Sequence, residues 1–110
     1  MAMVPDDDEL TAEEQLRELL ETLVEAFDVE AEVVTTVADG ELRGAVEGPG
    51  ATELVGAGGN VLEAVQHLAQ RIVLRGASGL RVVVDAAGYR GRREEALRGE
   101  ADRVADRVLS

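Results

Sequence analysis

The residues with the clearest capacity for chemistry form a glycine turn, Val55-Gly56-Ala57-Gly58-Gly59-Asn60-Val61. Gly56 and Gly59 are spaced so that the backbone bends sharply and still presents bare N–H groups. Asn60 then opens a helical pattern, with Glu63 three residues later. The first N–H groups of a helix have no partner within the helix, so a helix start after such a turn favours anions. The turn therefore predicts an anion-binding site.

Other kinds of chemistry have little support in the sequence. The chain has no cysteine and one histidine, His67, so disulfides and thiolate zinc sites are excluded and we expect no metal or other cofactor. There is no lysine for a phosphate-binding P-loop and no recognisable Ser/His/Asp or Cys/His constellation. Acid pairs such as Glu94-Glu95 are neighbours on a helix surface, whereas catalytic pairs need a cleft that shifts their pKa values. We therefore predict no catalytic residues and no enzyme.

The formal net charge of −12 is unevenly distributed. Residues 1–30 hold eleven acids and one Arg, whereas residues 56–110 hold seven acids and nine Arg. A negative chain is unfavourable for a nucleic-acid binder because long-range repulsion opposes approach to phosphates. The half that contains the turn is mildly basic, so a locally positive face remains compatible with phosphate binding. The simplest explanation of the acidic half is solubility.

Two groups of arginines are candidates for that basic face. Arg71 and Arg81 would line it, with Arg75 on the same helix face as Arg71; pairing with nearby acids is the alternative. The densest cluster, residues 90–93, has three arginines followed by Glu94-Glu95, so phosphate contact and local ion pairing both remain open. We expect Tyr89 to anchor the last helix by packing.

The elements that must position the turn can be read from hydrophobic periodicity. At 110 residues and 45% hydrophobic content the chain predicts one folded domain over residues 11–110, after a disordered acidic segment at 1–10. Thr11 and Glu14 form a capping box, and apolar residues at helical spacing predict a helix over 11–27.

Alternating patterns over 29–37 and 42–46 predict two strands joined by an Asp39-Gly40 turn. A short helical turn is expected at 51–55, helices at 60–75 and 89–109, and a strand at 80–85. Gly76 stands where a helix-capping glycine belongs. The last helix carries only a thin apolar stripe of Leu97, Ala101, Val104 and Val108. The predicted order is α-β-β-α-α-β-α.

Two blocks of the sequence resemble a protein family. The first block resembles part of the KH domain in bacterial Jag (SpoIIIJ-associated) proteins, where the pattern is L-I-G-x-x-G-x-T-L-D-A-L-Q-Y-L. In this chain the block is Leu54-Val55-Gly56-Ala57-Gly58-Gly59-Asn60-Val61-Leu62-Glu63-Ala64-Val65-Gln66-His67-Leu68. The run Asp85-Ala86-Ala87-Gly88-Tyr89-Arg90-Gly91-Arg92-Arg93-Glu94-Glu95 is similar to that family's D-x-x-G-Y-R-x-R-R-E-E block. Together the blocks cover roughly residues 50–98, and the G-x-x-G alone would be far less specific.

The resemblance implies an α+β fold of the bacterial, type II KH kind, with a three-stranded mixed sheet packed by helices. It also implies binding of single-stranded RNA through the turn and an adjacent groove that accepts about four nucleotides. The implied contacts are Gly56, Ala57, Gly58 and Gly59 for the phosphates, bordered by Val55, Asn60 and Val61, with Arg71 and Arg81 beside them.

Two departures from the family pattern predict weak binding. The variable pair of the turn is Ala57-Gly58, whereas the family's pair usually includes a basic residue. Family members usually continue into a second nucleic-acid-binding domain with an Arg-x-x-x-His motif, and we expect this chain to lack it.

The alternatives are a KH-fold protein-interaction or homodimerisation module with little RNA binding, and a designed or minimal KH fold. No apolar run approaches a membrane span and the N-terminus has no signal-peptide character, so we expect a cytoplasmic protein that does not bind membranes.

Overall fold

The first helix, α1 (Ala12–Ala26), begins at the predicted capping box. The computed structural model describes residues 11–73 and 80–109. The Glu14 N–H donates to Thr11 Oγ1 at 3.1 Å, and the Thr11 N–H donates to the Glu14 carboxylate at 3.4 Å. Leu16 and Leu20 are fully buried, whereas Phe27, just after the helix, is 42% exposed. The helix prediction is confirmed, and the middle of its apolar face supplies the deepest contacts.

The sheet has the order β1-β2-β3, with β1 (Glu32–Ala38), β2 (Glu41–Glu47) and β3 (Arg81–Ala86). β1 and β2 form the predicted antiparallel hairpin, and Asp39 and Gly40 both have positive φ in its turn. β3 pairs with β2 in parallel. The sheet is therefore mixed, as predicted, with β2 at its centre.

Gly44 at the middle of β2 sets how closely α1 packs against the sheet. A Cβ built on Gly44 would lie 2.6 Å from Leu20 Cδ1 and 2.8 Å from Leu16 Cδ2, closer than real Cβ contacts allow. The glycine thus provides space for two leucines of α1. Thr35 of β1 strengthens this contact, since its hydroxyl donates to Glu13 at 2.8 Å and accepts from Arg17 at 2.7 Å.

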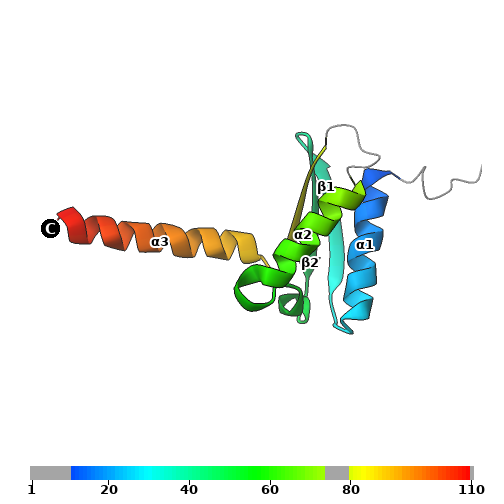
Figure 1. The fold of residues 1–110 in the computed structure, drawn as a ribbon, viewed down its shortest axis with the longest axis horizontal. Coiled ribbons are helices and arrows are strands. Elements are labelled where there is room, and N and C mark those ends of the chain that lie inside the picture. Colours follow the sequence, from blue (N-terminus) through cyan, green and yellow to red (C-terminus); the bar gives the residue numbers. More distant parts are fainter. Residues whose placement is uncertain (1–10, 74–79, 110) are drawn as a thin grey trace, which may run out of the picture.

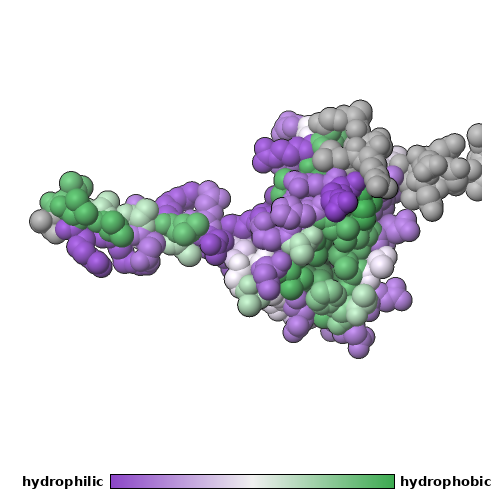
Figure 2. All heavy atoms as spheres, in the orientation of Figure 1, coloured by the Kyte–Doolittle hydropathy of each residue, from purple (hydrophilic) through white to green (hydrophobic). Residues whose placement is uncertain are grey.

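The helix that follows the glycine turn, α2 (Asn60–Val73), lies beside α1 in Figure 1, running in the opposite direction. Its buried residues join a core built from α1, the inward side chains of β2 and β3, and the segment before the turn. That segment is a short 3₁₀ helix, Ala51–Leu54, and it supplies the short fourth element of the predicted order. Figure 2 shows hydrophobic residues over the face that α1 and α2 form together.

The last helix, α3 (Tyr89–Leu109), extends away from the sheet and the other two helices (Figure 1). Its bounds match the predicted segment, and none of its residues is buried. It is 21 residues long, which corresponds to about 31 Å of helix. The only parts of α3 near the body of the protein are its first turns.

The structure is thus an α+β fold with three helices and a three-stranded mixed sheet over the described residues. The predicted acidic lead-in at 1–10, and the residues Arg75 and Gly76 at the predicted end of the middle helix, lie outside those residues. Among the helices described, none combines the length and apolar character that crossing a membrane requires.

Candidate nucleic-acid interface

The glycine turn uses backbone conformations that L side chains rarely adopt. Gly56, Gly58 and Gly59 have φ values of 75°, 63° and 85°. These lie in the region that glycine enters without steric cost. The three glycines therefore bend the chain between the 3₁₀ segment and α2.

Two of these glycines are also required by packing, and the third is not. A Cβ on Gly56 would lie 2.3 Å from Asn60 Oδ1 and 2.5 Å from Val61 Cγ2, and a Cβ on Gly59 would lie 2.9 Å from the Tyr89 ring. A Cβ on Gly58 would meet nothing within 4 Å. The folded chain alone thus explains Gly56 and Gly59, whereas Gly58 faces open space.

The hydrogen bonds of the turn leave two backbone donors unused. The Val55 carbonyl accepts from the N–H groups of Val61 and Leu62, and the Gly59 N–H donates to the Gly56 carbonyl at 3.3 Å. The N–H groups of Ala57 and Gly58 donate no hydrogen bond to any residue in the ranges that the structure covers. Unpaired donors beside the N-terminus of α2 are the arrangement that favours an anion.

A cleft of about 440 Å³ adjoins the turn. Residues of the turn, of the first turn of α2 and of the start of α3 line it: Gly58, Gly59, Glu63, Tyr89, Arg90, Arg93, Glu94 and Leu97. The Tyr89 ring lies against Gly59, and Arg93 Nη1 donates to the Tyr89 hydroxyl at 3.3 Å. The start of α3 thus forms one wall of the cleft and the glycine turn forms the other.

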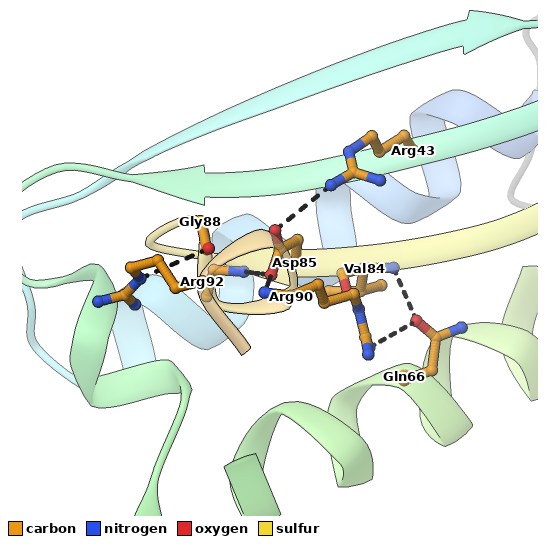
Figure 3. A network of polar contacts seen from close by, with 8 residues as sticks. Arg43, Gln66, Val84, Asp85, Gly88, Arg90 and Arg92 are labelled. Carbon is orange, nitrogen blue, oxygen red and sulfur yellow. Dashed lines mark hydrogen bonds and ion pairs between the residues drawn. The ribbon is translucent and has the colours of Figure 1, made fainter. Parts of the chain in front are cut away.

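The arginines of this wall differ in how they are engaged. Arg90 Nε donates to the Val84 carbonyl at 2.7 Å, and its guanidinium also contacts Gln66 at 3.2 Å and Glu63 at 3.6 Å. Figure 3 shows Arg90 directed toward Val84 and Gln66. Arg90 is therefore committed to contacts within the fold, while Arg93 is exposed and has the Tyr89 hydroxyl as its hydrogen-bond partner.

The outer edge of β3 is covered by side chains of this network. The amide of Gln66 donates to the Val82 carbonyl at 2.8 Å, as a neighbouring strand would. It also accepts from the Val84 N–H at 2.7 Å (Figure 3). The Arg90 side chain donates a hydrogen bond to the Val84 carbonyl. An unpaired strand edge invites pairing with another chain, and these contacts remove that opportunity.

Asp85 fixes the point where α3 leaves the sheet. The residue is 4% exposed, and one oxygen of its carboxylate accepts from the N–H groups of Ala86 and Arg90 at 2.9 and 3.2 Å. The other oxygen pairs with Arg43 of β2 at 3.3 Å (Figure 3). Because every polar atom of this buried carboxylate has a partner, the start of α3 is anchored to β2 and β3.

The predicted site residues are divided between the cleft and other regions. Gly58 and Gly59 line the cleft, and Asn60 is exposed at the start of α2. Val55 is only 7% exposed and belongs to the core, so it supports the turn from beneath. Val61 is half-buried and packs against the core.

The predicted arginines Arg71 and Arg81 lie at the other end of the molecule. Arg71 is in the last turn of α2, about 18 Å of helix beyond Gly59. Arg81 begins β3, where its N–H donates to Gly40 of the hairpin turn and its side chain lies 3.8 Å from Glu41. Neither residue lines the cleft beside the turn.

The cleft is also lined by six residues that the predicted site omitted: Glu63, Tyr89, Arg90, Arg93, Glu94 and Leu97. The sequence signal was present in the Gly88-Tyr89-Arg90 block, but nothing local to that block shows that it folds against residues about thirty positions earlier. In the described part of the chain, no three His, Cys, Asp or Glu side chains come together as metal ligands.

Comparison with known proteins does not assign this chain to a family. The chain matches no protein-family model, and no curated protein matches it significantly. The structure defines the chain as an α+β domain with a cleft beside a glycine turn.

Proposed function

We propose that this chain is a KH-like domain that binds single-stranded RNA weakly through the glycine turn and the adjoining cleft. One observation carries the proposal. The N–H groups of Ala57 and Gly58, which have no hydrogen-bond partner among the described residues, stand just before α2, and a Cβ at Gly58 would meet no described atom within 4 Å. A phosphate can approach such a backbone closely, because no side chain stands in the way.

The surrounding charges support a phosphate at this position. Arg93 lines the same cleft and is exposed, so its guanidinium can turn toward a phosphate. The N-terminus of α2 adds a partial positive charge. Single-stranded RNA is the preferred ligand because its backbone bends to follow a short cleft, which a duplex does not.

The same charges predict that binding is weak. Glu63 and Glu94 also line the cleft, Arg90 is engaged within the fold, and the chain carries a net charge of −12. Only one or two phosphates would be neutralised, so the slope of log K against log salt concentration should be about −0.7 to −1.4 for a single strand. Affinity should therefore fall several-fold, rather than by orders of magnitude, between low and moderate salt.

Selectivity among bases should also be low. Gln66 and Arg90 already occupy the outer backbone groups of β3 from Val82 to Val84, so these groups are not free to read a base edge. Tyr89 is packed against Gly59 rather than presented for stacking. Contacts to phosphate then dominate, and such contacts carry no sequence information.

The test introduces charge at the turn. In the double variant Ala57→Asp with Gly58→Asp, two carboxylates stand where the phosphate would lie. The fold should tolerate the change, because Asp accepts positive φ better than most residues and acids suit a helix N-terminus. Fluorescence anisotropy with a labelled pool of short single-stranded RNAs at low salt should show binding to the parent and none to this variant.

The matched control is Thr22→Asp with Thr36→Asp, which adds the same charge at exposed positions on α1 and β1. Equal losses in the two double variants would mean that general repulsion, and not the turn, governs the interaction. An unaffected turn variant would refute the proposal outright. In the opposite direction, Ala57→Lys should tighten binding and steepen the salt slope by about one.

A protein-interaction role is a second candidate function. One observation favours it: α3 leaves the body of the protein with an apolar stripe that nothing in the described chain covers.

A further inference from the structure

The apolar stripe of α3 comprises Leu97, Ala101, Val104 and Val108, and it is exposed along its whole length. Leu97 is 58% exposed, Val104 51% and Val108 75%. Figure 2 shows hydrophobic residues gathered along one side of the far part of α3, with hydrophilic residues along the other side. The part of α3 that carries the stripe, residues 97–109, is 13 residues long. Isolated helices of about that length are marginal in water, and proteins usually stabilise helices by burying an apolar face.

The spacing of the stripe is that of a coiled coil rather than of a helix that packs on a globular core. The intervals are four, three and four residues, so the stripe fills alternating d and a positions of a heptad. Position 97 is then a d position and position 101 an a position. A seam this narrow matches one partner helix, whereas a core-facing helix needs a broader apolar face.

We propose that α3 pairs with α3 of a second copy of this chain, in the antiparallel orientation. In that arrangement Leu97 meets Val108 of the partner subunit, and Ala101 meets Val104 of the partner subunit. The small Ala101 faces the larger valine in each central layer. The seam is therefore filled by alternating small and large side chains, as close helix packing requires.

The charges beside the seam decide the orientation. Glu100 and Arg107 are both at g positions, on the same flank of the stripe, and within one chain Glu100 also forms an exposed ion pair with Arg103. In antiparallel pairing, g positions face g positions, so Glu100 meets Arg107 of the partner subunit and the reciprocal contact forms as well. In parallel pairing, g positions face e positions, which puts Glu100 against Ala105 and Arg93 against Arg98 of the partner subunit. The antiparallel dimer thus has two opposite-charge pairs, whereas the parallel dimer places arginine against arginine. The antiparallel orientation is therefore preferred.

The pairing has a consequence for the cleft. Leu97 belongs both to the stripe and to the wall of the cleft beside the glycine turn. An antiparallel partner therefore brings the C-terminal turn of its α3 to the mouth of the cleft. The interface shares only Leu97 with the cleft and uses no residue of the glycine turn.

The expected affinity is low, because the paired segment is short. Residues 97–109 span about 20 Å of helix, and such a contact falls below the roughly 1,200 Å² of a standard stable interface. Sedimentation velocity of the full chain from about 10 μM to about 1 mM should show a monomer–dimer equilibrium, with a dissociation constant of about 100 μM.

The first variant is Val104→Asp, which places a charge in the central layer. It should weaken dimerisation at least tenfold, because burying an unpaired carboxylate is costly. Gly99→Asp, on the opposite face of the same helix, adds the same charge and should leave the dimer intact. Circular dichroism of both variants verifies that α3 remains helical.

The second experiment tests the partner and its orientation with charge exchange. Glu100→Arg and Arg107→Glu each place like charges opposite one another in a homodimer, so each should weaken self-association. An equimolar mixture of the two variants restores both opposite-charge pairs, and should associate about fivefold more tightly than either variant alone.

A strictly monomeric chain across the whole concentration range would overturn the proposal. So would a dimer that Val104→Asp does not weaken, since another surface would then hold it. A mixture with no preference over the single variants would overturn the antiparallel orientation. The RNA-binding proposal fails separately, because the substitutions at Ala57 and Gly58 leave α3 unchanged.

Discussion

Replacing Gln66 with Ala should lower the free energy of unfolding of this protein by about 1 to 2.5 kcal/mol. The Gln66 side chain makes two short hydrogen bonds to the outer edge of β3, at 2.8 Å to the Val82 carbonyl and 2.7 Å from the Val84 N–H. Each is part-buried, and such a bond contributes about 0.5 to 1.5 kcal/mol net. Ala offsets a few tenths of a kcal/mol of this loss, because it is the better helix former.

The side chain at this position has to donate and accept at once, because its two backbone partners have opposite polarity. Gln66→Glu keeps the length but turns the donor into a second acceptor, which then faces the Val82 carbonyl. Arg90 lies 3.2 Å from the Gln66 oxygen and offsets part of the added negative charge. Gln66→Glu should therefore also destabilise the fold, and most strongly where the carboxyl group is ionised, because only its protonated form both donates and accepts.

Urea unfolding followed by far-ultraviolet circular dichroism suits this chain, which has no Trp and a single Tyr for fluorescence. The matched control is Gln70→Ala, one turn further along α2, where the Gln side chain makes no hydrogen bond to any described residue. The expected loss corresponds to a thermal midpoint lower by about 4 to 8 °C per kcal/mol. Equal stability of the Gln66→Ala and Gln70→Ala variants would refute the assignment of Gln66 as the side chain that completes β3.

Three further substitutions test other parts of the framework. Asp85→Ala should lower the free energy of unfolding by about 2 to 4 kcal/mol, because it removes two hydrogen bonds to backbone N–H groups and the ion pair with Arg43. Chemical denaturation measures the loss, and parent-like stability would contradict the anchoring role. Gly59→Ala should cost about 1 to 3 kcal/mol, since φ is 85° and the new Cβ would lie 2.9 Å from Tyr89; unchanged thermal unfolding would show that the ring moves freely. Thr11→Ala should cost about 1 kcal/mol by removing the cap of α1, and a thermal midpoint equal to the parent's would mean that α1 does not need that cap.

The local framework was predictable because short-range signals determine it. The capping box at Thr11 marks where α1 begins, and Asp39-Gly40 marks the hairpin turn. Alternation in β2 identifies Leu42 and Val46 as the buried side chains. Each of these signals acts within a few residues, where propensity and periodicity dominate.

The rest of the site depends on contacts between distant segments, which periodicity does not encode. Gln66 reads as an ordinary polar helix residue, yet it completes β3 more than fifteen positions later. Arg90 and Arg93 look equivalent in sequence, yet only Arg90 is drawn into the fold. The family resemblance places Val55 at the border of the groove, but in the structure Val55 follows the 3₁₀ segment and lies in the core.

Gly58 separates a turn that merely connects two helices from a turn that receives a ligand. Packing explains Gly56 and Gly59, but a Cβ at Gly58 would meet no atom of the described residues within 4 Å. Asn tolerates positive φ, so Gly58→Asn should change stability by less than about 1 kcal/mol while placing a neutral side chain over the unpaired N–H groups. If a phosphate approaches the backbone here, this variant loses RNA binding at unchanged fold and unchanged net charge, as anisotropy would show beside a thermal melt. Parent-like RNA binding by a well-folded Gly58→Asn variant would mean that the turn serves the fold alone.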